Sequence, residues 1–337
     1  MYRKPEVFIA SAVLVLSPLT IETKAKVNTA TAKDITNNGI AVLWRQPADV
    51  AARNLFYGPG GKAHVPRGTF TFKEEDMAGT SPKFDVVDED GVKWRVKMGS
   101  EARPETVASR FVWAVGYFAN EDYFMPVLHV ENMPHLHRGS HLVSKDNNVS
   151  NVRLKRRLPD EKKIGIWSWA KDPFSGTREW YGLRVLMAVM NNWDLKDVNN
   201  SVYQTRGEPS EERYLVSDLG ASFGATGLYK APKGDPSAYC NSKWINRISP
   251  EFVDFNVPSS APPIAQVFNV YEMPRRLNLR WLGHHIPRKD ARWMGDLLAQ
   301  LSPQQIRDAF RAGGYSPDEV EQLSTVLERR IGELEKL

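Results

Sequence analysis

One stretch, from Tyr181 to Gly224, constrains the fold of this chain more than any other. Residues 181–190 are almost all apolar, and a helix that is apolar around most of its circumference is a buried one. This segment leads directly into Asn191–Asn200, which is dense in Asn and Asp. Two alternating segments, Ser201–Thr205 and Tyr214–Ser217, flank a Gly-Glu-Pro turn and predict an antiparallel hairpin. The stretch therefore predicts a core helix, a polar loop and a hairpin, in that order.

The polar residues of this stretch are expected to converge. The open ends of an antiparallel hairpin lie side by side, so Asn199 and Asp218 should meet in space. Asp194 belongs to the same loop as Asn199. Magnesium is usually bound by a few protein oxygens, with water and phosphate as its other ligands. The other interpretation is a turn segment after a core helix, where Asn and Asp gather because they tolerate left-handed backbone.

The spacing of these residues resembles that of protein kinases. Asp194-Leu195-Lys196-x-x-Asn199 resembles the kinase catalytic loop, and Asp218-Leu219-Gly220 resembles the metal-binding Asp-Phe-Gly, with Leu for Phe. Asn192-Trp193 stands where His-Arg usually precedes the catalytic Asp. That departure favours the distant kinase-like branches: HipA-type bacterial kinases, phosphoinositide kinases, and the secretory-pathway and spore-coat kinases. The resemblance implies a bilobal α+β fold, with a small β-rich N-terminal lobe containing one long helix and a larger, mostly helical C-terminal lobe.

The region before this stretch supplies the other residues that such a resemblance requires. Residues 84–97 predict a hairpin that ends in Trp-Arg-Val-Lys97, similar to the kinase strand whose Lys binds nucleotide phosphates. The preceding Gly-x-x-Pro-Lys83 loop resembles the phosphate-covering loop of HipA-type kinases, which makes Lys83 a nucleotide-binding candidate. A helix is predicted over 100–120, and Glu105 is the expected partner of Lys97. Glu101, one turn earlier on the same face, is the competitor. Acidic residues are also favoured in a helix's first turn without any such role.

The resemblance implies phosphoryl transfer from ATP with Mg²⁺ as the metal. Asp194 would orient the acceptor hydroxyl and take its proton, while Lys196 would contact the transferred group. Asn199 and Asp218 would hold the metal, and Lys97 would neutralise the phosphates. The acceptor is left open: a protein, a sugar, a lipid or a small molecule. Two alternatives stay open as well, a non-catalytic kinase-shaped binding module and an enzyme that transfers AMP.

The N-terminus predicts export. Met1–Ala32 has a charged start, an apolar run over residues 7–19 and an Ala-x-Ala-like site at its end, the pattern of a cleaved signal peptide. An uncut membrane anchor and a buried N-terminal strand are the alternatives. We accordingly expect a secreted or periplasmic protein with possible envelope association. Residues 33–170 would form the N-terminal extension and nucleotide-binding lobe, and residues 171–337 the catalytic, helical lobe.

Composition excludes several other classes. A net charge of +5 over 337 residues is weak for nucleic-acid binding, and no basic run is interleaved with aromatic residues. The single cysteine, Cys240, excludes an intrachain disulfide. Four histidines between residues 129 and 141 match no zinc-binding spacing, so we interpret them as an exposed loop.

Further elements are predicted on both sides of the central stretch. Residues 149–158 and 162–169 are expected to pair as another hairpin. Near the C-terminus, Ser302 and Ser316 each precede a proline and have an amide or acid three positions on, which predicts two capped helices.

Overall fold

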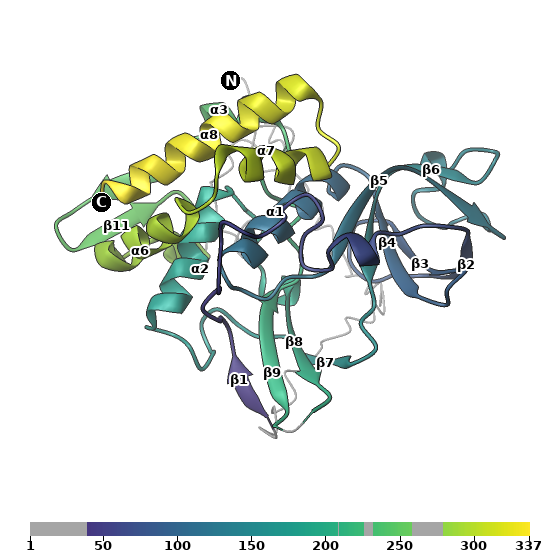
Figure 1. Ribbon diagram of the computed structural model, residues 1–337, viewed down its shortest axis with the longest axis horizontal. Helices are drawn as coiled ribbons and strands as arrows, with labels where there is room; N and C mark the ends of the chain where they lie inside the picture. Colours follow the sequence, from purple (N-terminus) through teal and green to yellow (C-terminus); the bar gives the residue numbers. More distant parts are fainter. Residues whose placement is uncertain (1–38, 208, 226–231, 258–278) are drawn as a thin grey trace, which may run out of the picture. The chain divides into compact units, whose positions relative to one another are not determined.

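The computed structural model describes residues 39–207, 209–225, 232–257 and 279–337. They form an α+β structure with a β-rich N-terminal region and a helical C-terminal region (Figure 1). The expected leader, residues 1–32, lies outside the described residues. Within the described ranges, no helix is both long enough and apolar enough to cross a membrane.

Five strands of the N-terminal region close into a barrel in the order β2-β3-β4-β6-β5 (Figure 1). Their bounds are Phe70–Glu75 for β2, Lys83–Asp88 for β3, Lys93–Met98 for β4, Asp122–Glu131 for β5 and Asn148–Arg156 for β6. Side chains alternate along a strand, so every second residue faces inward. The predicted β3–β4 hairpin is confirmed, with Phe84 opposite Val96 and both fully buried.

Helix α1, Ala102–Ala114, follows β4 almost directly, with Pro104 in its first turn. It contacts β5 and β6 of the barrel and also α7, which is why nearly all of its residues are buried. The helix predicted over 100–120 is thus confirmed but ends earlier. At Gly116 the backbone has φ 97°, and a Cβ there would lie 2.2 Å from the carbonyl oxygen of Arg45. Only glycine fits this turn, which directs the chain out of the helix towards β5.

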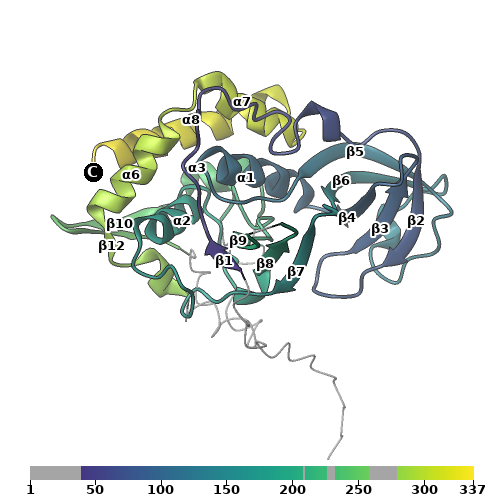
Figure 2. The same cartoon turned by 60° about the horizontal axis from the view of Figure 1, so that its bottom comes forward.

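A second sheet has the order β1-β9-β8-β7 (Figure 2). Its strands are Ile40–Val42 for β1, Glu161–Gly165 for β7, Asn200–Thr205 for β8 and Glu211–Val216 for β9. The predicted β8–β9 hairpin is confirmed, with Asn200 opposite Val216. The predicted pairing of residues 149–158 with 162–169 is wrong, because β6 pairs with β4 and β5 whereas β7 pairs with β8. Alternation identifies a strand but does not name its partner.

The C-terminal region is mainly helical and contains a small three-stranded sheet, β10-β11-β12. The helices are Arg178–Val189 for α2, Pro236–Asn241 for α3, Arg288–Leu298 for α6, Pro303–Ala312 for α7 and Pro317–Glu335 for α8. The strands are Ile245–Ile248 for β10, Phe252–Phe255 for β11 and Ile286–Pro287 for β12. Short 3₁₀ helices cover Lys62–His64, Ser140–Leu142, Asp197–Asn199 and Arg280–Gly283. The two predicted capping boxes, at Ser302 and Ser316, are confirmed at the starts of α7 and α8.

Two hydrophobic clusters hold the described residues together. The smaller one fills the barrel. The larger one contains α1, α2 and the C-terminal helices. In α2, residues 185–189 are fully buried, as the sequence predicted for this helix. Since α2 leads directly into Asn191–Asn200, this core fixes the place where the polar loop begins.

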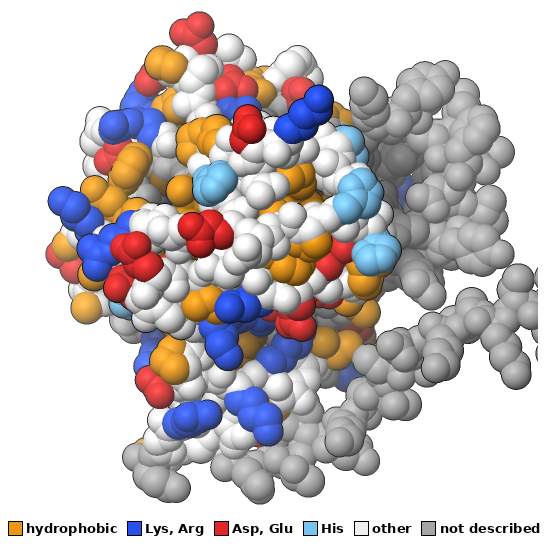
Figure 3. All heavy atoms as spheres, turned by 90° about the vertical axis from the view of Figure 1, so that its right-hand side faces the viewer, with side chains coloured by type: hydrophobic (Ala, Val, Ile, Leu, Met, Phe, Trp, Pro, Cys, Tyr) orange, Lys and Arg blue, Asp and Glu red, His pale blue; other side chains and the backbone are white. Residues whose placement is uncertain are grey.

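The far end of the barrel carries the histidines noted in the sequence. Figure 3 shows this side of the molecule, with histidine side chains at the surface among mixed charges. His129, His135, His137 and His141 are all exposed. His137 makes an ion pair with Glu75, with Nδ1 3.0 Å from Oε2. The expected exposed loop is therefore confirmed.

Candidate active site

Lys97 lies at the centre of a buried group of carboxylates. It sits near the end of β4, opposite Lys83 of β3, and only 3% of it is exposed. Its ammonium nitrogen is 2.9 Å from Glu105 Oε2, 3.0 Å from Asp218 Oδ1 and 2.5 Å from Glu101 Oε2. The three carboxylates come from two distant parts of the chain. The structure thus brings together the strand lysine, both candidate glutamates and the aspartate of Asp-Leu-Gly.

Glu105 bridges two cations inside the protein. It lies on α1 with 1% exposure, and its second oxygen, Oε1, accepts a hydrogen bond from Arg153 Nη2 at 2.6 Å. Arg153 is the residue opposite Lys97 in the β4–β6 pairing. Asp122 Oδ1 is 3.5 Å from Arg153 Nε on the other side. A buried charge requires such pairing, since an unpaired one is strongly destabilising.

Glu101 occupies a different position, at the N-cap of α1. It accepts a hydrogen bond from Ser81 Oγ at 2.9 Å and forms an ion pair with Lys233, from the segment after Asp-Leu-Gly. Glu105 and Glu101 are therefore both partners of Lys97, because both carboxylates contact its ammonium. Glu105 is buried between two barrel cations, whereas Glu101 connects Lys97 to the loop before β3.

The loop after α2 is held by its own amide side chains. Asn191 adopts φ 52°, and the side-chain oxygen of Asn192 accepts the backbone N–H of Asp194 at 3.0 Å. Asn199 donates from Nδ2 to the backbone carbonyl of Asp194 at 2.7 Å. Lys196 Nζ lies 3.1 Å from Asp194 Oδ1. As the alternative interpretation predicted, Asn side chains shape the backbone of this loop as a turn. The same loop also places Asp194 and Asn199 next to each other.

The β8–β9 hairpin brings Asp218 to this loop, as the sequence predicted. The backbone N–H groups of Ser217 and Asp218 both donate to the carbonyl of Asn199, at 2.8 and 3.1 Å. Gly220 N–H donates to Asp218 Oδ1 at 3.2 Å. From α1's C-terminal side, Asn120 Nδ2 donates to the carbonyl of Ser217 at 3.0 Å. Asp218 is therefore fixed between the polar loop and Lys97, with 39% of its side chain exposed.

The charges of this group reinforce one another. Burial disfavours the Lys97 ammonium, but the carboxylates of Glu105, Asp218 and Glu101 outweigh burial and raise the pKa of Lys97. Burial raises the pKa of Asp218, but the charge of Lys97 lowers it. The net effect is a lowered pKa. Lys97 and Lys233 likewise overcome burial and lower the pKa of Glu101 to about 2. Lys97 is thus a permanent cation, and Asp218 and Glu101 are permanent carboxylates at neutral pH.

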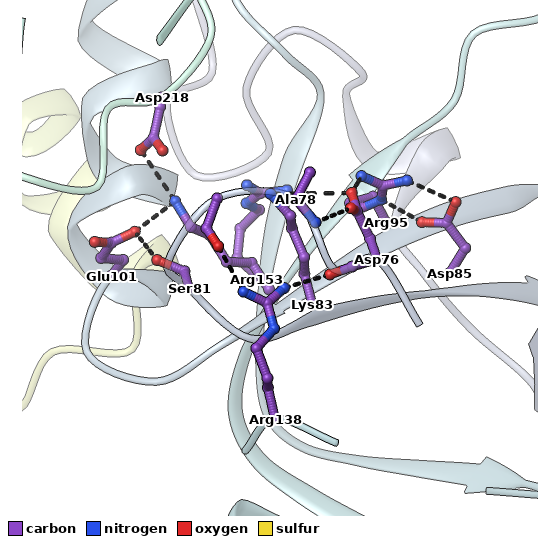
Figure 4. Close-up of polar contacts among 12 residues, drawn as sticks. Asp76, Ala78, Ser81, Lys83, Asp85, Arg95, Glu101, Arg138, Arg153 and Asp218 are labelled. Carbon is purple, nitrogen blue, oxygen red and sulfur yellow. Dashed lines mark hydrogen bonds and ion pairs between the residues drawn. The ribbon is translucent and has the colours of Figure 1, made fainter. Parts of the chain in front are cut away.

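The loop between β2 and β3 is fixed by contacts that the sequence did not reveal (Figure 4). Arg138, from the β5–β6 connection, donates to the backbone carbonyls of Asp76 and Gly79. Arg95 forms ion pairs with Asp76 and with Asp85. Lys83, the candidate at the end of this loop, is 3.9 Å from Asp76 Oδ2, and burial followed by the charge of Lys97 lowers its pKa.

Oxygen atoms of Glu101, Glu105 and Asp218 lie within 4.8 Å of one another, but all three carboxylates already contact the Lys97 ammonium. Asn199 uses its amide nitrogen to bind the backbone carbonyl of Asp194, so only its amide oxygen could serve as a ligand. Carboxylate and amide oxygens are the ligands that Mg²⁺ takes from proteins. Asn199 and Asp218 are joined through their backbones, and their role as metal ligands stays a prediction.

Several solved structures are similar to this one, and two of them are kinases. The Helicobacter pylori proinflammatory kinase CtkA is 13% identical at a TM-score of 0.44, covering 80% of this chain and 98% of that chain. The Golgi casein kinase is 11% identical at a TM-score of 0.29, covering 79% of this chain and 73% of that chain. No protein-family model and no curated protein sequence matches this chain. Both similarities are distant, so the chemistry of the site has to be inferred from its own contacts.

Proposed function

We propose that this protein is a kinase-like phosphotransferase that uses ATP and Mg²⁺ to phosphorylate a hydroxyl acceptor. One observation carries the proposal: the ammonium of Lys97 contacts both Glu105 and Asp218, and Asp218 is bonded to the Asp194–Asn199 loop. Phosphoryl transfer needs little covalent chemistry from a protein. It needs positioned reactants and groups that neutralise developing charge.

The proposed roles follow from where each side chain is held. Lys97 is kept charged by its carboxylates, which suits a group that neutralises nucleotide phosphates. Lys83 begins the strand beside Lys97 and follows the loop that Arg138 and Arg95 fix, so it can contact the same nucleotide. Asn199 and Asp218 would hold Mg²⁺, which when bound screens the charge of the phosphates.

The acceptor side of the reaction falls to the loop after α2. The backbone of Asp194 is held by hydrogen bonds to the side chains of Asn192 and Asn199. Its carboxylate is therefore anchored, which suits a group that orients and deprotonates an acceptor hydroxyl. Lys196 pairs with that carboxylate. Its flexible four-carbon stem allows the ammonium to turn to the transferred phosphoryl group instead.

The test is transfer of label from ATP by the purified chain, with an envelope extract as the source of acceptors. Label from the γ-phosphate should appear on the chain itself or on an acceptor. Asp194→Asn and Asp218→Asn should each reduce it by at least about 10²-fold, the usual effect of removing one charge-stabilising group. Asp146→Asn, at an exposed position of the β5–β6 turn, is the matched control and should leave transfer unchanged.

The alternatives give different results in the same assay. Label from the α-phosphate would identify an AMP-transferring enzyme. Stabilisation by Mg-ATP without any transfer, lost in Asp218→Asn, would identify a binding module. An absence of both transfer and stabilisation would refute nucleotide binding altogether. We also propose export to the envelope or beyond; sequencing the mature N-terminus of protein recovered outside the cytoplasm tests cleavage after residue 32.

A further inference from the structure

The outer face of the barrel is unusually rich in cations where it faces the second sheet. Residues that alternate with the buried ones of β4 and β6 form cross-strand pairs: Lys97 lies opposite Arg153, and Arg95 lies opposite Lys155. All four are cations. Like charges directly opposite each other on a sheet are destabilising. Each of these residues therefore requires compensation from elsewhere.

Three of the four have that compensation. Lys97 and Arg153 share Glu105, and Arg95 has two carboxylates of its own. Lys155 is the exception, because no carboxylate among the described residues forms an ion pair with it. Asp122 lies opposite on β5, but that carboxylate is directed at Arg153, 3.5 Å away.

A second lysine of the same region is exposed and also has no ion pair in the described part of the chain. Lys163 belongs to β7, opposite Tyr203 of β8, and within the described ranges it too has no ion-pair partner. Loss of water around it, and then the charges of Lys155 and Arg157, lower the pKa of Lys163. The two lysines come from different sheets but line the same cavity, where like charges repel.

Both lysines line one cavity of about 340 Å³, between the end of α1, the β6–β7 connection and the β8–β9 hairpin. Two acids also line it, but each is already paired. Glu121 is 2.8 Å from His64, and Glu161 is 2.7 Å from Arg213. Aromatic side chains supply part of the wall, among them Trp113, Phe118 and Tyr203. The cavity thus combines uncompensated positive charge with an apolar surface.

We propose that this cavity binds a phosphate-class anion, with Lys155 and Lys163 as the residues that hold it. An anion between two unpaired ammonium groups relieves their repulsion and replaces the water that the partly buried Lys155 has lost. The volume accommodates pyrophosphate or a small organic phosphate, whose carbon part could lie against the aromatic wall. The site is separate from the Lys97 group and does not require that the protein transfers phosphate.

The cavity is nevertheless connected to the proposed active site. Asn120 lines it and donates from its side chain to the carbonyl of Ser217, the residue before Asp218. The anion could be a phosphate group of the nucleotide itself or a separate ligand. Both sources share the same chemistry at the two lysines, and competition between ligands separates them.

The experiment measures stabilisation of the full chain by inorganic pyrophosphate, without divalent metal, using thermal shift and calorimetry. Wild type should be stabilised, and Lys155→Met/Lys163→Met should bind pyrophosphate at least about tenfold more weakly, as expected when two charge-assisted contacts are lost. The double variant should remain folded and have the higher Tm without anion, because repulsion is removed. Lys155→Arg/Lys163→Arg keeps both charges and should keep binding.

Two controls decide where the anion binds. Lys162→Met removes an exposed cation from the same strand and should change nothing. Asp218→Asn alters the Lys97 group and should leave pyrophosphate binding intact. Binding that is unaffected by the double methionine change, that is lost in Asp218→Asn, or that is missing in wild type overturns the proposal. If ATP without metal displaces pyrophosphate, the nucleotide's own phosphates occupy the cavity; if it does not, the ligand is a separate one, and either result supports the site.

Discussion

Lys97 and Lys155 lie on neighbouring strands and on the same face of one barrel, yet their surroundings are opposite. Lys97 contacts three carboxylates and is almost completely buried. Lys155 is partly buried and has no ion pair with a described residue. Accordingly the pKa of Lys97 is raised, whereas burial and then the Arg153 guanidinium lower the pKa of Lys155 to about 8. The carboxylates in contact with each lysine thus decide whether its pKa is raised or lowered.

This difference separates two uses of a cation. A lysine surrounded by acids is pre-positioned, and its neighbours have already offset the cost of taking it out of water. Such a group can face a nucleotide without reorganisation. A lysine without acids destabilises the empty protein and gains most when an anion arrives. The first arrangement suits catalysis and the second suits ligand binding.

The largest effect on stability is expected from Glu105→Gln. The change removes the carboxylate that Lys97 and Arg153 share, and it leaves two buried cations less compensated. Breaking a buried pair in this way costs about 3–5 kcal/mol. Urea unfolding followed by circular dichroism should show a loss of about 3 kcal/mol, because Asp218 and Asp122 retain part of the compensation. Lys155→Met, on the uncompensated side, should show no loss, and equal losses in both variants would contradict the comparison.

A smaller effect is expected in acid, from Glu101. Its folded pKa of about 2 lies below the ordinary glutamate value of about 4.3. A lowered carboxyl pKa stabilises the folded state above the unfolded pKa, and this contribution is lost as pH falls through the folded pKa. The difference in unfolding free energy between wild type and Glu101→Gln should be about 2 kcal/mol at pH 7, after discounting for partial exposure. It should shrink steadily as pH falls from about 5 towards 2.

The control for this experiment is Glu131→Gln, at an exposed position of β5. That variant should differ little from wild type across the same pH range. A Glu101→Gln difference that stays constant with pH would mean that Glu101 acts through packing and not through its charge.

Much of this site could be predicted from sequence because its elements are local. The buried helix before Asn191, the loop to Asn199 and the hairpin to Asp218 follow one another, and hairpin closure alone brings the last two together. The Lys97–Glu105 contact spans one turn between a strand and the next helix. The capping boxes at Ser302 and Ser316 are local in the same sense.

The contacts that sequence reasoning missed join segments that are far apart. Arg153 reaches Glu105 only because β6 pairs with β4, and Arg138 reaches the β2–β3 loop across the barrel. Lys233 meets Glu101 from the segment after Asp-Leu-Gly. The wrong pairing of β7 has the same origin, since a strand's pattern indicates which face is buried and leaves its neighbour undefined.

The smallest predicted effect lies in alkali, where stability should again rise with pH, as it does for Glu101 in acid. The unfolded chain holds the Lys155 proton to about pH 10.4, whereas the folded protein releases it near pH 8. Stability rises with pH wherever the unfolded state binds more protons. Wild type should therefore gain about 1 kcal/mol relative to Lys155→Met between pH 8 and 10, after discounting for partial exposure. Lys162→Met should show no such trend, and saturating pyrophosphate should abolish it, because a bound anion returns the pKa of Lys155 towards its ordinary value. A flat or falling difference without anion would mean that Lys155 is compensated after all, and the contrast with Lys97 would be lost.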